Sequence, residues 1–488
     1  MLRGVDGSTD SAAASDAAPR ELDVETDAAT NSRARTESTT AGARSLAVLP
    51  TIVFAQFAGT SLWFAPNAVA SQIDGAGDTQ IATLTSLVQV GFIVGTFGLT
   101  YLNVADRFRA EVVFAVMCAL GSLLNFLCVL NTDFAVWATL RTVVGVCLAG
   151  VYPVGMKIAA KQYPHGLGAR LGLLVGALTL GTAFPWLLRG LGNSFPFEVT
   201  LLAVSVLALV GGALLLLVLV PWKDIWPAFR SLLTWSTPAH DLQALKLGWA
   251  SIKEICSAKD FRAAAMGYFG HCWELYAWWA YVPNLIEAHE ATLEVGQTPV
   301  LPMAMFTFFA IAIGAVACAV AGAWGLWAGR GILPGSSVVA NLSLATSMCC
   351  CFLAPLYQRM TPVGFFVYIA VWGWSIVADS AQFSTLLAQS APRTLMGTAL
   401  TLTTCIGFSV TVVGIQVLGA VLDAGVDPGI AFVLLGPGPV IGLFCSYSRW
   451  PVHRVVCKER DHTFTATEPE VPGRSMPEVE VDPINFEK

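Results

Sequence analysis

The chain has 488 residues, of which 55% are hydrophobic and only 12% are charged. The charged share is about half that of a typical soluble domain, which argues against a large soluble protein of several domains. The net charge of −6 is concentrated in the two end segments and identifies no partner. Because the basic residues form no patch, nucleic-acid binding is excluded.

The N-terminal segment 1–44 is rich in Ala, Ser, Thr and Asp and has no apolar periodicity. Such a composition buries too little apolar surface to fold, so we expect a disordered tail. No apolar core follows a basic start, which argues against a cleavable signal. The acidic, Pro-containing segment 449–488 predicts a second tail at the other end.

Between the tails lie about twelve apolar stretches, each roughly 18–27 residues long. A helix needs about 20 apolar residues to cross a bilayer, and only helices or closed barrels satisfy their backbone polar groups there. Because the stretches lack the alternation of barrel strands, they predict an all-α integral membrane protein with twelve transmembrane helices. The expected spans are 46–70, 81–104, 111–131, 134–156, 169–190, 197–220, 263–287, 301–327, 335–356, 362–387, 396–422 and 429–447.

The longest break between spans is 221–262, which we interpret as a central linker. Within it, 242–257 has the pattern of a short amphipathic helix lying along the membrane. The linker divides the chain into an N-terminal six-helix bundle at 45–220 and a C-terminal six-helix bundle at 263–448.

The two bundles repeat one another in sequence. The first span ends in Trp63-Phe64-Ala65-Pro66-Asn67, and the seventh ends in Trp279-Ala280-Tyr281-Val282-Pro283-Asn284. The fifth and eleventh spans also open alike, at nearly the same offset along the chain. Repeated halves with a binding site between them at mid-membrane are typical of secondary transporters.

Lysine and arginine residues indicate the orientation, because they accumulate in cytoplasmic loops. With the N-terminus in the cytoplasm, the internal loops hold 13 of them, and the external loops hold only Arg189 and Arg359. Both termini are therefore expected in the cytoplasm.

The loop after the second span carries two basic residues and an acid, in the run Tyr101-Leu102-Asn103-Val104-Ala105-Asp106-Arg107-Phe108-Arg109. It resembles the loop motif of the major facilitator superfamily, although the leading Gly of that motif is absent. The fourth span, with Arg141 and Gly145, and the glycine-rich fifth span also resemble superfamily patterns. The resemblance covers about 46–450. The chain is similar in general to a poorly characterised bacterial-type branch with members labelled nitrate/nitrite-porter-like.

This resemblance implies the major facilitator fold, with two pseudo-symmetric six-helix bundles and transport by alternating access. It also implies that Asp106, Arg107 and Arg109 form a latch that gates the cytoplasmic face. The matching loop of the second half is degraded, because Leu326 and Trp327 stand where the acid and Arg are expected. The alternative is that all three are ordinary loop charges.

Ionisable residues inside the spans are the strongest pointers to a site, because a charge at mid-membrane costs about 2.5–3.5 kcal/mol. Arg141 could attract an anion or control the proton of a nearby acid, or it could hold helices together. His271 and Glu274 lie three residues apart on the seventh span and share a helix face. Buried Glu and His side chains can both exchange a proton near neutral pH. The alternative is a hydrogen-bonded core pair.

Further polar residues lie within the other spans. Asp379, on the tenth span, could bind a cation or a proton, or cap the cytoplasmic end of its helix. Asn67, Asn284 and Gln89 could bind substrate, although such residues more often hydrogen-bond neighbouring helices.

No catalytic residue, metal site or cofactor is predicted, since neither a phosphate-binding glycine loop nor a zinc-enzyme pattern is present. We expect a monomeric transporter in the lipid bilayer that moves a small polar or anionic solute and couples this to protons. An exporter or a uniporter is the alternative within transport. The alternatives outside it are a non-transporting membrane sensor or scaffold and, with less support, an intramembrane enzyme.

Overall fold

The computed structural model describes residues 47–69, 78–130, 133–163, 167–192, 195–235, 248–328 and 335–449. The tail predicted at 1–44 and the part of the C-terminal tail after Arg449 lie outside these residues, as does the first part, 242–247, of the predicted 242–257 helix. Within the described residues all regular secondary structure is helical, which confirms the all-α fold class.

Ten helices or helix pairs of the described chain are long and apolar enough to cross a membrane. They are α3 (Asp78–Tyr101), α5 (Ala110–Leu127) with η2 (Cys128–Leu130), α6 (Phe134–Ala149) with α7 (Tyr152–Gln162), α8 (Leu167–Leu191), α9 (Phe197–Leu219), α13 (Met303–Ala328), α14 (Ser336–Leu353) with η3 (Ala354–Arg359), α15 (Pro362–Ala378) with α16 (Ser380–Ser390), α17 (Met396–Asp423), and α18 (Pro428–Phe432) with η5 (Val433–Leu435) and α19 (Pro437–Arg449). Three short helices, α4 (Val104–Arg107), α10 (Trp222–Thr234) and α11 (Trp249–Ser257), lie between spans, and η4 (Arg393–Leu395) precedes α17.

Two further segments complete the twelve predicted crossings of the described chain. The first crossing is a helix, Ala47–Thr60, that stops and restarts as α2 (Ala65–Val69). Pro66 is compatible with this restart, because proline is tolerated in the first turn of a helix. The seventh crossing, α12 (Lys259–Glu290), is rich in Trp, Tyr and polar residues, which makes it less apolar than the other ten.

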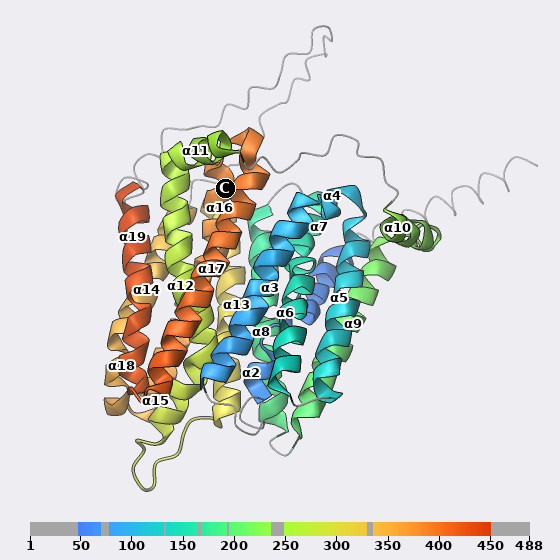
Figure 1. The fold of residues 1–488 in the computed structure, drawn as a ribbon. Coiled ribbons are helices and arrows are strands. Elements are labelled where there is room, and N and C mark those ends of the chain that lie inside the picture. The colour runs from blue at the N-terminus through green and yellow to red at the C-terminus, as the bar shows by residue number, and fades with distance from the viewer. Residues whose placement is uncertain are drawn as a thin grey trace, which may run out of the picture.

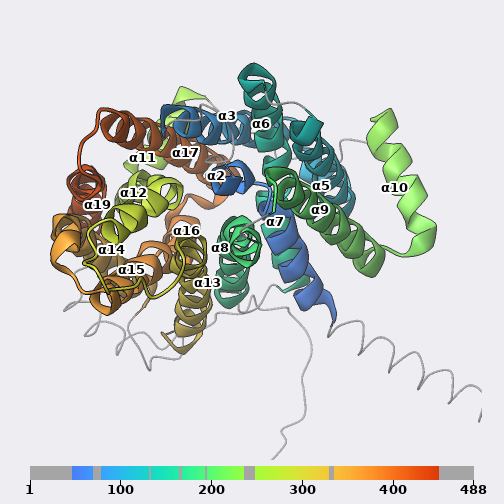
Figure 2. The ribbon, with the colours of Figure 1, turned by 90° about the horizontal axis from the view of Figure 1, so that it is seen from below.

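The helices form two groups that lie side by side (Figures 1 and 2). Seen from below, the blue and green helices α2–α9 occupy one side and the yellow-to-red helices α12–α19 the other. Two pairs of helices make the most extensive contacts between the groups. They are α8 with α13 and α3 with α17.

The α8–α13 seam depends on small residues, which let helix backbones approach closely. A Cβ atom at Gly172 would lie 2.7 Å from the Cys318 carbonyl oxygen, and one at Gly176 would lie 2.8 Å from that of Ala315. No larger residue fits these positions without a backbone shift. The predicted glycine-rich fifth span is therefore an inter-bundle contact.

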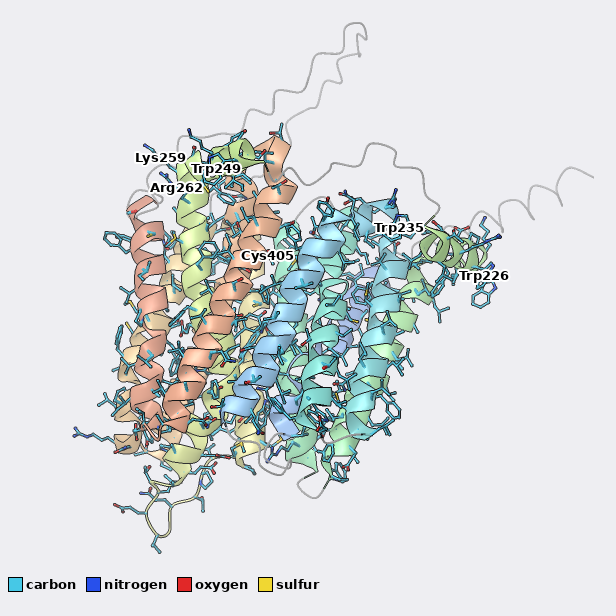
Figure 3. The ribbon with its side chains drawn as sticks, viewed as in Figure 1. Trp226, Trp235, Trp249, Lys259, Arg262 and Cys405 are labelled. Atoms are coloured by element: carbon cyan, nitrogen blue, oxygen red, sulfur yellow. The ribbon has the colours of Figure 1, made fainter. Side chains whose placement is uncertain are left out.

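The α3–α17 seam is closed at one end and in the middle. The Thr79 amide donates to Asp423 Oδ2 at 3.0 Å, and Gln416 Nε2 donates to Ser86 Oγ at 3.0 Å. Further along, Cys405 of α17 faces α3 (Figure 3), with its Sγ 3.9 Å from a carbonyl oxygen. A Cβ atom added at Gly98, in the last turn of α3, or at Gly397, in the first turn of α17, would meet no neighbouring atom within 4 Å.

Candidate functional site

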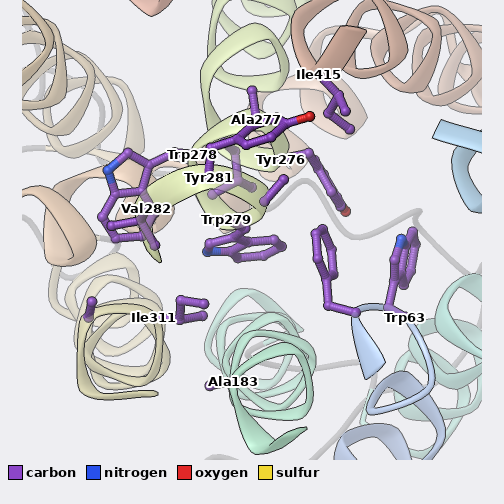
Figure 4. Packing of buried hydrophobic residues seen from close by; sticks show 14 of the residues in the cluster. Trp63, Ala183, Tyr276, Ala277, Trp278, Trp279, Tyr281, Val282, Ile311 and Ile415 are labelled. Carbon is purple, nitrogen blue, oxygen red and sulfur yellow. The ribbon is translucent and has the colours of Figure 1, made fainter. Parts of the chain in front are cut away.

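Aromatic side chains of both bundles meet at the middle of the interface. The Trp63 ring lies 5.8 Å from Tyr276 and 4.9 Å from Phe92, and Phe92 lies 4.3 Å from Phe408. Figure 4 shows Trp63 on one side of this packing and the side chains of α12, including Trp279, on the other. The indole N–H groups of Trp63 and Trp279 are buried without a hydrogen-bond partner among the described residues. The two repeated Trp motifs therefore end at one shared interface.

Gln89 of α3 is buried near this cluster. Its side chain is 0% exposed, and neither amide atom has a hydrogen-bond partner among the described residues. It follows Ser86 of the α3–α17 seam by about one helical turn. An unpaired buried polar group costs about 1–3 kcal/mol, so Gln89 is a candidate to bind a solute.

Arg141 stabilises the break in the first crossing. Its Nη2 donates to the carbonyl oxygens of Leu62 and Trp63 at 2.7 and 2.6 Å, and its Nη1 donates to Asn125 Oδ1 at 3.1 Å. The side chain is 0% exposed. Backbone carbonyls at a helix break lack hydrogen-bond donors within their own helix, and the Arg141 guanidinium donates the missing hydrogen bonds. Of the two predicted roles for Arg141, this geometry favours the structural one.

His271 pairs with Asp379, although the two residues are far apart in sequence. His271 Nδ1 lies 2.8 Å from Asp379 Oδ1, and its Nε2 lies 2.7 Å from Ser380 Oγ. Both side chains are almost completely buried, and Asp379 Oδ2 has no hydrogen-bond partner among the described residues. The sequence indicated each residue separately, but it did not indicate that they form a pair.

Glu274 has a different set of partners from His271. One oxygen accepts from Trp372 Nε1 at 2.7 Å and from Cys351 Sγ at 3.3 Å, and the other accepts from Ser347 Oγ at 2.8 Å. These donors belong to α14 and α15, so the carboxyl group points into its own bundle. The side chain is 1% exposed. The shared helix face of His271 and Glu274 thus serves two separate clusters.

Asp379 lies where the tenth crossing breaks, at the junction of α15 and α16. The fourth crossing breaks at the equivalent place, between α6 and α7, and α7 begins at Tyr152. Tyr152 is half-buried against the aromatic cluster and lies near Cys272 and Cys318 of the other bundle. Sequence reasoning missed Tyr152. The only feature of the sequence that marks the helix break at Tyr152 is the pair Gly150 and Pro153 within an apolar span.

The two candidate asparagines lie near the ends of the first and seventh crossings. Asn67 Nδ2 donates to Thr85 Oγ1 at 3.0 Å, within its own bundle. Asn284 is half-buried on α12, near the end of the seventh crossing. Asn67 thus makes the interhelical hydrogen bond that was the alternative for such residues.

The loop predicted as a latch binds its own half of the molecule. Asp106 forms a salt bridge with Lys157 of α7. Arg109 Nη1 lies 3.3 Å from Asp224 of α10, and the Arg107 guanidinium lies over the Trp235 ring, 5.3 Å from its centroid. In this conformation, the ion pairs of the described loop residues all lie on the side of the α2–α9 group.

Within the described part of the chain, no group of three or more His, Cys, Asp or Glu side chains is placed to hold a metal ion. The polar groups at the bundle interface can instead donate, accept and exchange protons. The arrangement is suited to reversible binding of a small solute.

Comparison with known proteins identifies the family of the fold. The family model described as Major Facilitator Superfamily matches residues 48–415. A crystal structure of a variant of the nucleoside transporter NupG superposes with a TM-score of 0.60 at 13% sequence identity, covering 83% of this chain and 99% of that one. A search of curated proteins found no match.

Proposed function

The chain belongs to the major facilitator superfamily, and from this premise we propose that it carries a small polar or anionic solute by alternating access coupled to protons. The fold supports a secondary transporter with its site between the two halves. The α3–α17 seam is tight from the Thr79–Asp423 contact to Cys405. These contacts support a state closed at the end where Thr79 and Asp423 lie, which the loop charges predict to be the outside.

The observation that carries the coupling proposal is the buried His271–Asp379 pair at a helix break. With one proton shared between them the pair is neutral overall, and without that proton it holds a net negative charge. A lone charge inside the membrane is costly. The pair therefore releases its proton only when water or a solute reaches it, which links protonation to the transport cycle.

The solute would contact the aromatic cluster and the unpaired polar groups beside it. The free indole N–H groups of Trp63 and Trp279 suit an acceptor oxygen or nitrogen, and the Gln89 amide can both donate and accept. The rings suit a solute with a flat face. Nucleosides are the first solutes to test because NupG is a nucleoside transporter. Nitrate is the second, because the sequence resembles a branch with members labelled nitrate/nitrite-porter-like.

The experiment is uptake into proteoliposomes that contain the purified protein, with and without a pH gradient, over a panel of nucleosides, sugars, carboxylates and nitrate. One proton per neutral solute allows about tenfold accumulation for each pH unit, since one unit is about 1.36 kcal/mol. We expect Asp379→Asn to lose accumulation and keep exchange of solute between the two sides.

Glu274→Gln is the matched variant, because Glu274 is an equally buried carboxyl of the same bundle. If Asp379→Asn accumulates solute as well as wild type and Glu274→Gln does not, the coupling site is Glu274. If no solute of the panel moves in any vesicle, a sensor or scaffold becomes the better explanation. Deletion of 1–44 and 459–488 is the second check, because a transporter should keep most of its flux without them.

A further inference from the structure

The linker helix α10 lies across the ends of the spans. It begins at Trp222, shortly after α9 ends at Leu219. In Figure 2 most crossings are seen nearly end-on, whereas α10 is seen along its length beside α5 and α9. None of its residues is fully buried. The helix therefore lies roughly parallel to the membrane plane, at the level where the crossings end (Figure 1).

One face of α10 is an exposed apolar stripe. Trp222 is 81% exposed, Trp226 is 70% exposed and Leu233 is 71% exposed. Together with the half-buried Phe229 they follow the spacing of successive helical turns, so they share one face. Two exposed tryptophans and a leucine on one short helix are unusual for a face in contact with water.

The other faces of α10 have different surroundings. Leu232 packs against the core of the N-terminal bundle, and Asp224 faces Arg109. Lys223 and Arg230 are exposed and flank the apolar stripe on one side. The helix thus combines a face on the protein, an uncovered apolar face and a basic border between that face and water.

We propose that α10 docks on the lipid bilayer itself, in the headgroup region of an anionic leaflet. Tryptophans at the water–lipid boundary and flanking Lys or Arg residues are the features by which interfacial helices bind anionic lipid. The preceding helix α9 also exposes apolar side chains, among them Leu214 and Leu217. Figure 3 shows Trp226 projecting from α10 away from the bundle. Trp222, Trp226 and Leu233 enter the apolar layer, while Lys223 and Arg230 meet lipid phosphates.

Docking of α10 also positions the loop that carries Asp106. Trp235, at the C-terminal end of α10, adopts a left-handed conformation with φ 52°. Its ring packs edge-on against Phe108 at 5.0 Å and lies under the Arg107 guanidinium. With the Arg109–Asp224 ion pair, these contacts tie the loop to the lipid-bound helix. The inference needs the membrane-crossing fold but no particular solute, so it can fail without affecting the transport proposal.

The test is hydrogen–deuterium exchange of the backbone amides of 222–234 in the full-length protein, in nanodiscs that hold one copy each. Discs of phosphatidylcholine are compared with discs that also contain phosphatidylserine. We expect slower exchange with phosphatidylserine. In both lipids, the triple variant Trp222→Ser, Trp226→Ser, Leu233→Ser should exchange about tenfold faster than wild type. Lys223→Gln with Arg230→Gln should remove the difference between the two lipids.

Trp249→Ser is the matched control, because Trp249 is 80% exposed on the other linker helix, α11. It should leave exchange of α10 unchanged. Equal exchange in wild type and the triple variant would overturn the docking proposal. Protection that is absent in these discs and appears only in discs with two copies would overturn it as well.

Quenching of tryptophan fluorescence by brominated lipid provides a second measurement that does not depend on the helix remaining folded. Trp226→Phe should reduce the part of the tryptophan fluorescence that brominated lipid quenches. If the quenched part is the same as in wild type, Trp226 does not insert into the lipid.

Discussion

Replacement of Arg141 tests whether this buried charge is structural. Its guanidinium binds two backbone carbonyls and Asn125 from a fully buried position. Lysine keeps the charge but loses the planar fork that reaches several acceptors at once. Arg141→Lys should therefore lose at least one contact, and Arg141→Met should lose all three.

The size of the effect follows from these contacts. Hydrogen bonds to charged groups contribute about 1.5–3 kcal/mol each in soluble proteins, whereas side-chain bonds between membrane helices average about 0.6 kcal/mol. Three lost contacts, partly offset because Met has no charge to desolvate, give about 2–4 kcal/mol of destabilisation for Arg141→Met. Arg141→Lys should cost about half as much, since some of its contacts survive.

The assay is thermal unfolding in detergent with a thiol-reactive fluorophore. Cys118 and Cys128 are 0% exposed and react only when their bundle opens. The expected order of unfolding midpoints is wild type, then Arg141→Lys, then Arg141→Met. Lys161→Met is the control, because Lys161 is an exposed basic residue of the same crossing and should keep the wild-type midpoint.

A contrary result would be a wild-type midpoint for Arg141→Met together with a selective loss of anion transport. The guanidinium would then bind solute, and the backbone contacts would matter little for stability. Measuring stability and solute preference on the same samples separates these two roles.

Two further predictions concern the loop and the seam. Asp106→Asn should sharply reduce vesicle flux at near-normal folded yield, because it removes the charge that pairs with Lys157; unchanged flux would make Asp106 an ordinary loop charge. Gly176→Leu should cost about 1–3 kcal/mol or more and lower the yield of monodisperse protein in size-exclusion chromatography, since its Cβ would lie 2.8 Å from a backbone oxygen. Gly168→Leu, on the same helix and with no neighbouring atom within 4 Å of an added Cβ, should behave like wild type, and an equal loss in both variants would contradict a specific role of the seam.

The fold was predictable because the length and apolarity of the spans are local properties. Exceptions arise where tertiary contacts decide the boundary. The seventh span was expected at 263–287, but α12 runs from Lys259 to Glu290 because charged residues extend the helix at both ends. In the linker, α11 at Trp249–Ser257 lies within the amphipathic helix expected at 242–257, whereas α10 at Trp222–Thr234 was not predicted.

The candidate site was only partly predictable. Arg141, His271, Glu274 and Asp379 were recognised as costly residues inside spans, and all four are buried. Their partners could not be read from the sequence, because a hydrogen bond between distant helices leaves no local pattern. The helix break that places Asp379 beside His271 was equally hidden, since no glycine or proline marks it.

The two halves use their fourth helix in related ways, and the difference between them bears on function. In the first half, Arg141 of the fourth crossing holds the backbone of the first crossing at Leu62 and Trp63. In the second half, Asp379 of the equivalent crossing holds His271 of the seventh. An Arg guanidinium keeps its charge throughout any physiological range, whereas a His–Asp pair can gain or lose a proton. In the first half, the two crossings are therefore held together by a side chain of fixed charge. In the second half, they are held together by a pair that can gain or lose a proton. Coupling to protons is therefore expected to reside in the second half, where protonation can change how two crossings are held together.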